Sequence, residues 1–220
     1  MERIFAIGDI HGCSKTFEVI LFDKLQIQKS DQIYCVGDYI DRGHDSKGVI
    51  DMILKLRDDG YSIYTLRGNH EQMMIDAFTF EEAMEVWIKN GGGQTLESFG
   101  IASLNDLPDR YLSFLMETEF FFEKDNYIFA HAGLNFRNEN IFEDKEAMLW
   151  IRDFDRYQPA LGDRLLIHGH TPERLNYILN QKENCINIDG GCVYVHKKHF
   201  GNLVAMDLDE RKFISVANCE

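Results

Sequence analysis

The sequence predicts an α/β domain of the α+β kind, in which strand–loop–helix units come first and a β-rich part comes last. Two observations support this class. In the first third, short apolar runs alternate with amphipathic segments, which implies parallel strands joined by right-handed crossovers. After residue 120, short apolar or alternating runs follow one another with turn residues between them. No repeat, low-complexity tract or linker divides the 220 residues, so we expect one domain over residues 1–220.

The first third supplies three predicted strands and two predicted helices. The strands, residues 3–7, 33–36 and 61–66, each run into a glycine-containing loop. Ser14 is a candidate N-cap for a helix that ends near residue 25. Apolar residues at helical spacing predict the second helix over residues 46–56. Ligands of parallel sheets gather beyond the carboxyl ends of the strands, so these loops are expected to carry function.

The middle of the chain, residues 72–118, is predicted to be mainly helical. Its methionine-rich stripe, which begins at Met73, is interpreted as core packing rather than as a cofactor site. The glycine run at residues 90–93 ends one helix, and residues 105–108 open another. Later strands are predicted at residues 120–123, 127–130, 164–167, 185–188, 193–196, 203–207 and 213–216.

Composition and charge exclude several classes of function. With 45% hydrophobic and 12% aromatic residues, the chain can bury a large core, which argues against disorder. The formal net charge of −14 argues against nucleic acid or an anionic membrane as partner, because both need clustered Lys and Arg. A phosphorylated substrate stays compatible with this charge, because bound metals make a site locally cationic.

The five cysteines predict a reducing compartment. They are odd in number, form no C-x-x-C pair and mostly lie in apolar runs. No signal peptide or membrane-spanning run is visible, so the sequence predicts a soluble, cytoplasmic protein.

Five loops that follow predicted strands carry groups that bind divalent metal ions. In an extended strand end, residues i and i+2 point the same way, so Asp9 and His11 can hold one ion together. A mixture of carboxylate, imidazole and amide groups is typical of a site for Mn, Fe or Zn ions. It does not resemble a structural zinc site, which is built from thiolates. The candidate metal ligands are Asp9, His11, Asp38, Asn69, His131 and His170.

The loops resemble the signature motifs of the phosphoprotein phosphatase family, a branch of the calcineurin-like metallophosphoesterases. The matching stretches are GDIHG at residues 8–12, GDYIDRG at 37–43 and GNHE at 68–71, followed by HAG at 131–133 and GHT at 169–171. GNHEQMMID and the NGGG run look closest to the phage-lambda-type and bacterial serine/threonine protein phosphatases. The resemblance implies a β-sandwich flanked by helices, with a dimetal site at the carboxyl ends of the strands.

The resemblance also implies how the metal ions are held. Asp9, His11 and Asp38 would bind one divalent ion, and Asp38, Asn69, His131 and His170 a second. The expected ions are two Mn²⁺, with Fe or Zn as alternatives, and the implied reaction is direct attack of a metal-bridging hydroxide on phosphorus. Phosphorylated proteins or peptides are the implied partners.

Further residues receive roles from the same resemblance. His70 would be the general acid toward the leaving alkoxide, and Asp41 would orient it. Arg42 and Arg67 would hold the phosphoryl oxygens as bidentate donors. Arg152 resembles a further phosphate-binding arginine of the phage branch, on a looser match.

Several alternatives stay open in the sequence. His168 competes with His170 as a ligand, and His170 is favoured because it directly precedes Thr171, as in the family motif. Exposed positions without a site role are expected for His44, His196 and His199, and Asp189 is explained by a tight turn.

The alternative enzyme is a symmetrical dinucleoside-tetraphosphate hydrolase, which shares the fold and metals. Glu71 and Asp41 favour a phosphomonoesterase, because enzymes of the symmetrical type typically carry Asp at the first position and differ at the second. A metal-binding scaffold without catalysis is disfavoured, since ligands, acid and arginines occur together.

Overall fold

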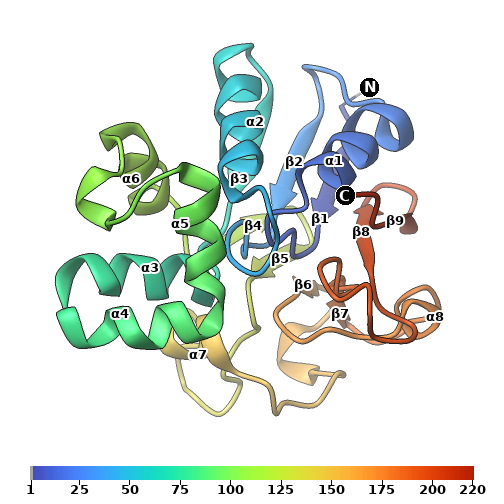
Figure 1. Ribbon diagram of the computed structural model, residues 1–220. Helices are drawn as coiled ribbons and strands as arrows, with labels where there is room; N and C mark the ends of the chain where they lie inside the picture. The colour runs from blue at the N-terminus through green and yellow to red at the C-terminus, as the bar shows by residue number, and fades with distance from the viewer. Residues whose placement is uncertain (1) are drawn as a thin grey trace.

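The computed structural model describes residues 2–220 and contains two β-sheets with helices around them (Figure 1). One sheet has five strands in the order β3-β2-β1-β8-β9, and the other has four in the order β4-β5-β6-β7. The mixed α/β class with helix-flanked sheets is therefore confirmed. The strands are β1 Ile4–Ile7, β2 Gln32–Cys35, β3 Ser62–Thr65, β4 Phe121–Lys124, β5 Tyr127–Ala130, β6 Leu165–His168, β7 Cys185–Asn187, β8 Asn202–Asp207 and β9 Lys212–Ala217.

The five-stranded sheet begins with the parallel strands that the sequence predicted. β1 pairs with β2, and β2 with β3, both in parallel register. The first crossover is α1 (Ser14–Glu18), which continues as a π-helix, η1 (Val19–Leu25). The second is α2 (Ser46–Asp58), which begins where the side chain of Asp45 accepts a hydrogen bond from the N–H of Gly48 at 2.9 Å. Both predicted helices are present.

The two sheets pack face to face through apolar side chains. Tyr34 of β2 stacks against Tyr64 of β3 and against Phe129 of β5, with ring centroids 4.6 and 4.3 Å apart. The same buried cluster contains Val36, which directly follows β2, and Ile167 of β6. This contact fixes the ends of β1, β2 and β3 beside the ends of β5 and β6.

The helical middle belongs to the buried cluster on the outer face of the five-stranded sheet, where η1 and α2 contact strands and α5 (Gly93–Phe99) packs against α2 (Figure 1). Met73 and Met74 are buried there, which confirms their interpretation as core. In the described part of the chain, every helix is too short or too polar to cross a membrane. The remaining helical segments are α3 Asn69–Thr79, α4 Glu81–Trp87, η2 Ile88–Gly92, α5 Gly93–Phe99, η3 Leu104–Asp106, α6 Asp109–Met116, α7 Lys145–Trp150, η4 Pro159–Leu161 and α8 Leu175–Ile178.

The strand predicted at residues 193–196 is wrong. The chain makes consecutive turns there, since Tyr194 N–H donates to Gly191 O at 2.8 Å and Lys197 N–H donates to Tyr194 O at 3.0 Å. Gly201 N–H then donates to Gly191 O at 2.9 Å and closes the loop. The valines at 193 and 195 alternate as in a strand, but glycines with positive φ bracket the segment at both ends. The loop instead carries Tyr194 and Lys197 toward the strand ends.

Candidate active site

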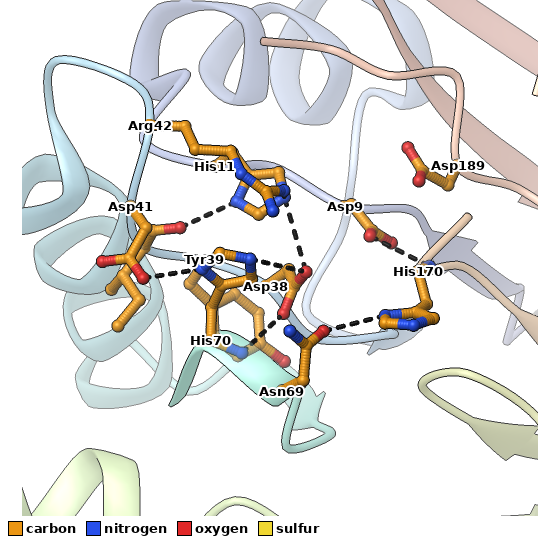
Figure 2. Close-up of polar contacts among 12 residues, drawn as sticks. Asp9, His11, Asp38, Tyr39, Asp41, Arg42, Asn69, His70, His170 and Asp189 are labelled. Atoms are coloured by element: carbon orange, nitrogen blue, oxygen red, sulfur yellow. Dashed lines mark hydrogen bonds and ion pairs between the residues drawn. The ribbon is translucent and has the colours of Figure 1, made fainter. Parts of the chain in front are cut away.

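The loops that follow five strands meet at one edge of the two sheets, and Figure 2 labels residues of those after β1, β2, β3 and β6. The loops after β1, β2 and β3 come from the five-stranded sheet, and those after β5 and β6 come from the four-stranded sheet. Every predicted metal ligand lies at this edge and is at most 5% exposed: Asp9, His11, Asp38, Asn69, His131 and His170.

Gly37 lets β2 end in close contact with two neighbouring loops. Its φ is +108°, and a Cβ at this position would lie 2.7 Å from the backbone nitrogen of Gly68 and 2.9 Å from Nδ1 of His131. Nδ1 of His131 donates to the carbonyl of Val36 at 2.9 Å. This bond fixes the tautomer of His131 and leaves the lone pair of its Nε2 directed into the site.

Nε2 of His131 and two other side-chain atoms that can accept hydrogen bonds converge at this point. Nε2 of His131 lies 3.0 Å from Oδ1 of Asn69 and 3.2 Å from Nδ1 of His170, and these last two atoms are 2.8 Å apart. Neither Nε2 of His131 nor the amide oxygen of Asn69 carries a proton to share. A cation among these atoms satisfies all of them, so the donor set fits a divalent metal ion.

Asp38 belongs both to this group and to a second one, which contains His11, Asp38 and His70. Its Oδ1 is 3.5 Å from Nε2 of His131, and its Oδ2 is 3.4 Å from Nε2 of His11. Nδ1 of His11 donates to Ile40 O at 2.8 Å, so its Nε2 is also an acceptor directed into the site. One carboxylate thus faces two groups of ligand atoms, as expected for a residue shared by two ions.

Asp9 is brought to the site but joins neither group at ligand distance. Its Oδ2 accepts the backbone N–H of His170 at 3.0 Å. Burial and the neighbouring carboxylates of Asp189 and Asp38 raise the pKa of Asp9 well above its ordinary value. A bound cation would relieve this crowding of carboxylates.

Some buried polar atoms at this edge of the sheets lack hydrogen-bond partners. Within residues 2–220, the buried side-chain nitrogen and oxygen atoms that lack a hydrogen-bond partner are Asp9 Oδ1, His70 Nε2 and His170 Nε2. Buried polar atoms almost always have partners, so these exceptions, on residues that follow β1, β3 and β6, mark a site built for a ligand.

The imidazoles of the predicted ligands are also in the protonation state that binds metal ions. Burial lowers the pKa of His11 to about 3 and that of His170 to about 2, and it lowers the pKa of His131 as well. All three rings are therefore neutral near pH 7, which is the form that binds metals.

His70 and Asp41 form a buried hydrogen-bonded pair. Nδ1 of His70 lies 2.6 Å from Oδ2 of Asp41, and Nε2 of His70 faces Asp38 at 4.0 Å (Figure 2). Burial by itself lowers the pKa of His70, but the carboxylates of Asp38 and Asp41 outweigh it and raise the pKa above its ordinary value. The ring can therefore hold a proton on Nε2, where it faces the metal ligands.

Two of the three predicted phosphate-binding arginines lie together. Arg42 and Arg152 line a cavity of about 270 Å³ beside His170. Nη1 of Arg42 reaches Nε2 of His11 at 2.6 Å, and Nη1 of Arg152 donates to Thr171 Oγ1 at 3.1 Å. Both guanidinium groups are close enough to the metal ligands to bind oxygens of a phosphoryl group.

Arg67 is not brought to this cavity. Its guanidinium donates to Thr118 Oγ1 at 3.0 Å, to Gln72 Oε1 at 3.2 Å and to the backbone carbonyl of Met116 at 3.0 Å. These contacts tie Arg67 to the end of α6 and to α3. Phosphate binding by Arg67 would require them to break, so that role stays a prediction.

The ambiguous histidines separate clearly in space. Nδ1 of His168 lies 3.2 Å from Gly169 O, and its ring packs against Phe154, away from the ligand atoms, whereas His170 is among them. The side chains of His44, His196 and His199 are exposed, as expected.

Glu71 has a structural role that the sequence did not predict. Its buried carboxylate accepts the backbone N–H groups of Asp38 and Tyr39, both at 2.8 Å, and of Gly68 at 2.9 Å. It therefore fixes the loop that presents Asp38. The sequence signal for this role is the position of Glu71 in the GNHE motif. A carboxylate in that motif that does not bind metal must have another partner.

The sequence does not predict any site role for Trp87 and Thr95. Both side chains are buried and donate hydrogen bonds to the carboxylate of Asp41. They lie 46 and 54 residues away from it in the chain, within a segment whose sequence shows only helix and glycine signals.

Comparisons with known proteins agree with this geometry. A model of the calcineurin-like phosphoesterase family matches residues 2–206. The chain is 28% identical to an asymmetrical bis(5'-nucleosyl)-tetraphosphatase of Oceanobacillus iheyensis, over 98% of this chain and 92% of that protein. It is 29% identical to serine/threonine-protein phosphatase 2 of Salmonella typhimurium, over 77% of this chain and 79% of that protein.

A solved structure supports the fold. The crystal structure of a cold-active protein tyrosine phosphatase superposes with a TM-score of 0.66, covering 99% of this chain and 77% of that chain at 15% identity. The family match over nearly the whole chain and the geometry at the strand ends lead to one conclusion: this chain belongs to the calcineurin-like phosphoesterase family.

Proposed function

We propose that this phosphoesterase is a metal-dependent phosphomonoesterase that hydrolyses phosphoserine and phosphothreonine side chains of proteins. The observation that carries the proposal is the buried pair of His70 and Asp41, joined at 2.6 Å, with Nε2 of His70 facing the metal ligands. A serine or threonine alkoxide is a poor leaving group and needs a proton as its bond to phosphorus breaks. An imidazolium N–H can supply that proton.

The metal ligands would be divided as the sequence predicts. Asp9, His11 and Asp38 would hold one ion, and Asp38 would share the second with a group of three, Asn69, His131 and His170. We propose Mn²⁺ as the native ion, with Fe or Zn as alternatives. When bound, two such ions lower the pKa of water and offset the charge of the phosphoryl group.

The chain's own residues would bind the phosphoryl group and supply the proton to the leaving oxygen. Arg42 and Arg152 would donate to the phosphoryl oxygens and orient phosphorus toward the metal ligands. His70 would donate its Nε2 proton to the leaving oxygen while Asp41 holds the ring at Nδ1. A reducing, cytoplasmic setting is part of the proposal, supported by five free cysteines, of which four are buried.

A second candidate substrate is a dinucleoside tetraphosphate, cleaved asymmetrically. Its support is the similarity over nearly the full length to an asymmetrical bis(5'-nucleosyl)-tetraphosphatase. The Glu71 argument weighs only against the symmetrical type. The cavity beside His170 is a second observation in its favour, because Arg42, Arg152, Lys197 and Tyr194 all line it. In the described part of the chain, none of the three cations pairs with a carboxylate, so they are available to a polyphosphate.

One experiment separates the two candidates. The protein is stripped with a chelator and restored separately with Mn²⁺, Fe²⁺, Zn²⁺ or Mg²⁺. Each form is then assayed on phosphoserine, phosphothreonine and phosphotyrosine peptides and on diadenosine tetraphosphate. We expect Mn²⁺ to restore the highest kcat/KM on the phosphoserine and phosphothreonine peptides.

Other outcomes would change the assignment in defined ways. A higher kcat/KM on the dinucleotide, with ATP and AMP as products, would establish the second candidate. Two molecules of ADP would indicate the symmetrical reaction. No activity with any metal would contradict the proposed mechanism.

A further inference from the structure

We infer that Trp87 and Thr95 are positioning residues for the acid pair, and that they hold the carboxylate of Asp41 in the orientation that aligns His70. The inference rests on the proposed function, since it concerns the same proton transfer. Trp87 ends α4 and Thr95 lies in α5, so neither belongs to a loop that carries metal ligands.

Hydrogen bonds from these two side chains fix both oxygens of the Asp41 carboxylate. Thr95 Oγ1 donates to Oδ1 at 2.6 Å. Nε1 of Trp87 donates to both oxygens, at 3.1 Å to Oδ1 and at 3.0 Å to Oδ2. Oδ2 is also the atom that contacts Nδ1 of His70. With three donors around it, the carboxylate cannot rotate without breaking at least one hydrogen bond.

The backbone of Asp41 is held by Thr95 of α5 and by Ser46 of α2. Its N–H points at the hydroxyl oxygens of Thr95 and Ser46, at 2.9 and 3.1 Å. Thr95 thus accepts from the backbone and donates to the side chain of one residue, which matches its single hydroxyl proton. All of these side chains are at most 1% exposed, so water does not compete for the hydrogen bonds.

The glycine run between Trp87 and Thr95 explains how this segment approaches the loop so closely. Gly91 has φ +113°, and a Cβ there would lie 2.7 Å from the backbone nitrogen of Arg42. A Cβ at Gly92 would lie 2.4 Å from the ring of Trp87. The NGGG run therefore leaves room for the ring of Trp87 and lets residues 90–93 pack against Arg42, which follows Asp41. This is a more specific role than ending a helix.

The test removes one hydroxyl and follows two leaving groups. Thr95→Val keeps the shape of the side chain but removes the bond to Oδ1 of Asp41. We expect kcat on a phosphoserine peptide to fall about 10-fold, a part of the roughly 10²–10⁴-fold that a general acid supplies. On 4-nitrophenyl phosphate, whose leaving group needs little protonation, the fall is expected to be less than half as large on a logarithmic scale. Thr95→Ser restores the hydroxyl and is expected to recover most of the rate.

Trp87→Phe is the second variant, because it keeps a buried ring and removes the indole N–H. It is expected to show the same dependence on the leaving group. Thr65→Val is the matched control: Thr65 is a buried threonine in β3 that accepts from Arg57 at 2.8 Å, outside the site, so it should keep the wild-type ratio of the two rates. Thermal unfolding of every variant shows which ones fold.

The outcomes are distinguishable. Equal loss on both substrates in folded Thr95→Val and Trp87→Phe, or no loss on either, contradicts the positioning role while leaving the proposed function intact. Absence of metal-dependent hydrolysis by the wild-type protein contradicts the proposed function itself.

Discussion

Removing the imidazole at position 70 should separate proton transfer from metal binding. His70→Asn is expected to lower kcat on a phosphoserine peptide by about 10²–10⁴-fold, and by much less on 4-nitrophenyl phosphate. The affinity for Mn²⁺, measured by calorimetry, should stay at the wild-type value. His70 lies within ligand distance of His11 and Asp38, so a large loss of affinity would mean that it is a metal ligand instead.

Replacing each of the two carboxylates of the GDYIDRG loop by an amide should have a different effect on metal binding. Asp38 faces both groups of ligand atoms, so Asp38→Asn is expected to weaken the binding of both ions by at least 10-fold each. Asp41 contacts His70, Trp87 and Thr95 instead, so Asp41→Asn should keep the metals and slow turnover. Calorimetric titration of each variant with Mn²⁺ distinguishes these expectations. Equal metal loss in both would contradict the division of roles.

His168 gives the folded state a dependence on pH that is separate from catalysis. Burial lowers its pKa from the ordinary 6.5 to about 4, so folding favours the neutral ring. Its contribution is present above pH 6.5 and is lost as the pH falls toward 4, by at most about 3 kcal/mol from the shift in pKa. Urea unfolding of the chelated protein at pH 7.5 and 4.5 should show a smaller loss in His168→Gln than in wild type. Equal losses would show that His168 does not contribute.

At the scale of elements, the end of β2 depends on a glycine that has no room for a side chain. Gly37→Ala places a Cβ against Gly68 and His131 in addition to straining a residue with φ +108°. Gly100→Ala is the matched control, because φ is +66° there and no atom lies within 4 Å of the added Cβ. The control should lose about 1–2 kcal/mol of stability from strain alone. Gly37→Ala should lose more and should also bind Mn²⁺ more weakly, and equal effects in the two variants would contradict this account.

The sequence was most informative about elements whose own residues carry the pattern that identifies them. β1, β2, β3, β5 and β6 are apolar runs that end at polar loops, so local pattern and motif together predicted where the ligands lie. The segment at residues 193–196 shows the same alternation but no neighbouring strand to pair with, and that absence is a tertiary fact. Trp87, Thr95 and the contacts of Arg67 were beyond prediction for the same reason. Their partners are distant in the chain, and no periodicity encodes a hydrogen bond across 54 residues.

At the scale of the whole molecule, bound metal should stabilise the packing of one sheet on the other. The predicted ligands come from both sheets, so an ion binds the folded state and not its separated parts. Each occupied site adds about 2.7 kcal/mol when the free ion is at 100 times its Kd. Chelation should therefore lower the Tm, and Mn²⁺ should restore it. A Tm that is independent of Mn²⁺ in wild type but normal turnover would contradict this coupling.

The hydrogen bond from the backbone of His170 to Asp9 joins residues 161 positions apart, and this separation bears on synthesis. Asp9, His11, Asp38 and Asn69 leave the ribosome long before His131 and His170 do. A nascent chain can therefore present an incomplete set of metal ligands for most of its translation. The ligands proposed for the first ion are all present once residue 38 has emerged, whereas those for the second ion are complete only after β6 has emerged and docked. Capture of the second ion is therefore expected to be one of the last events in the folding of the chain.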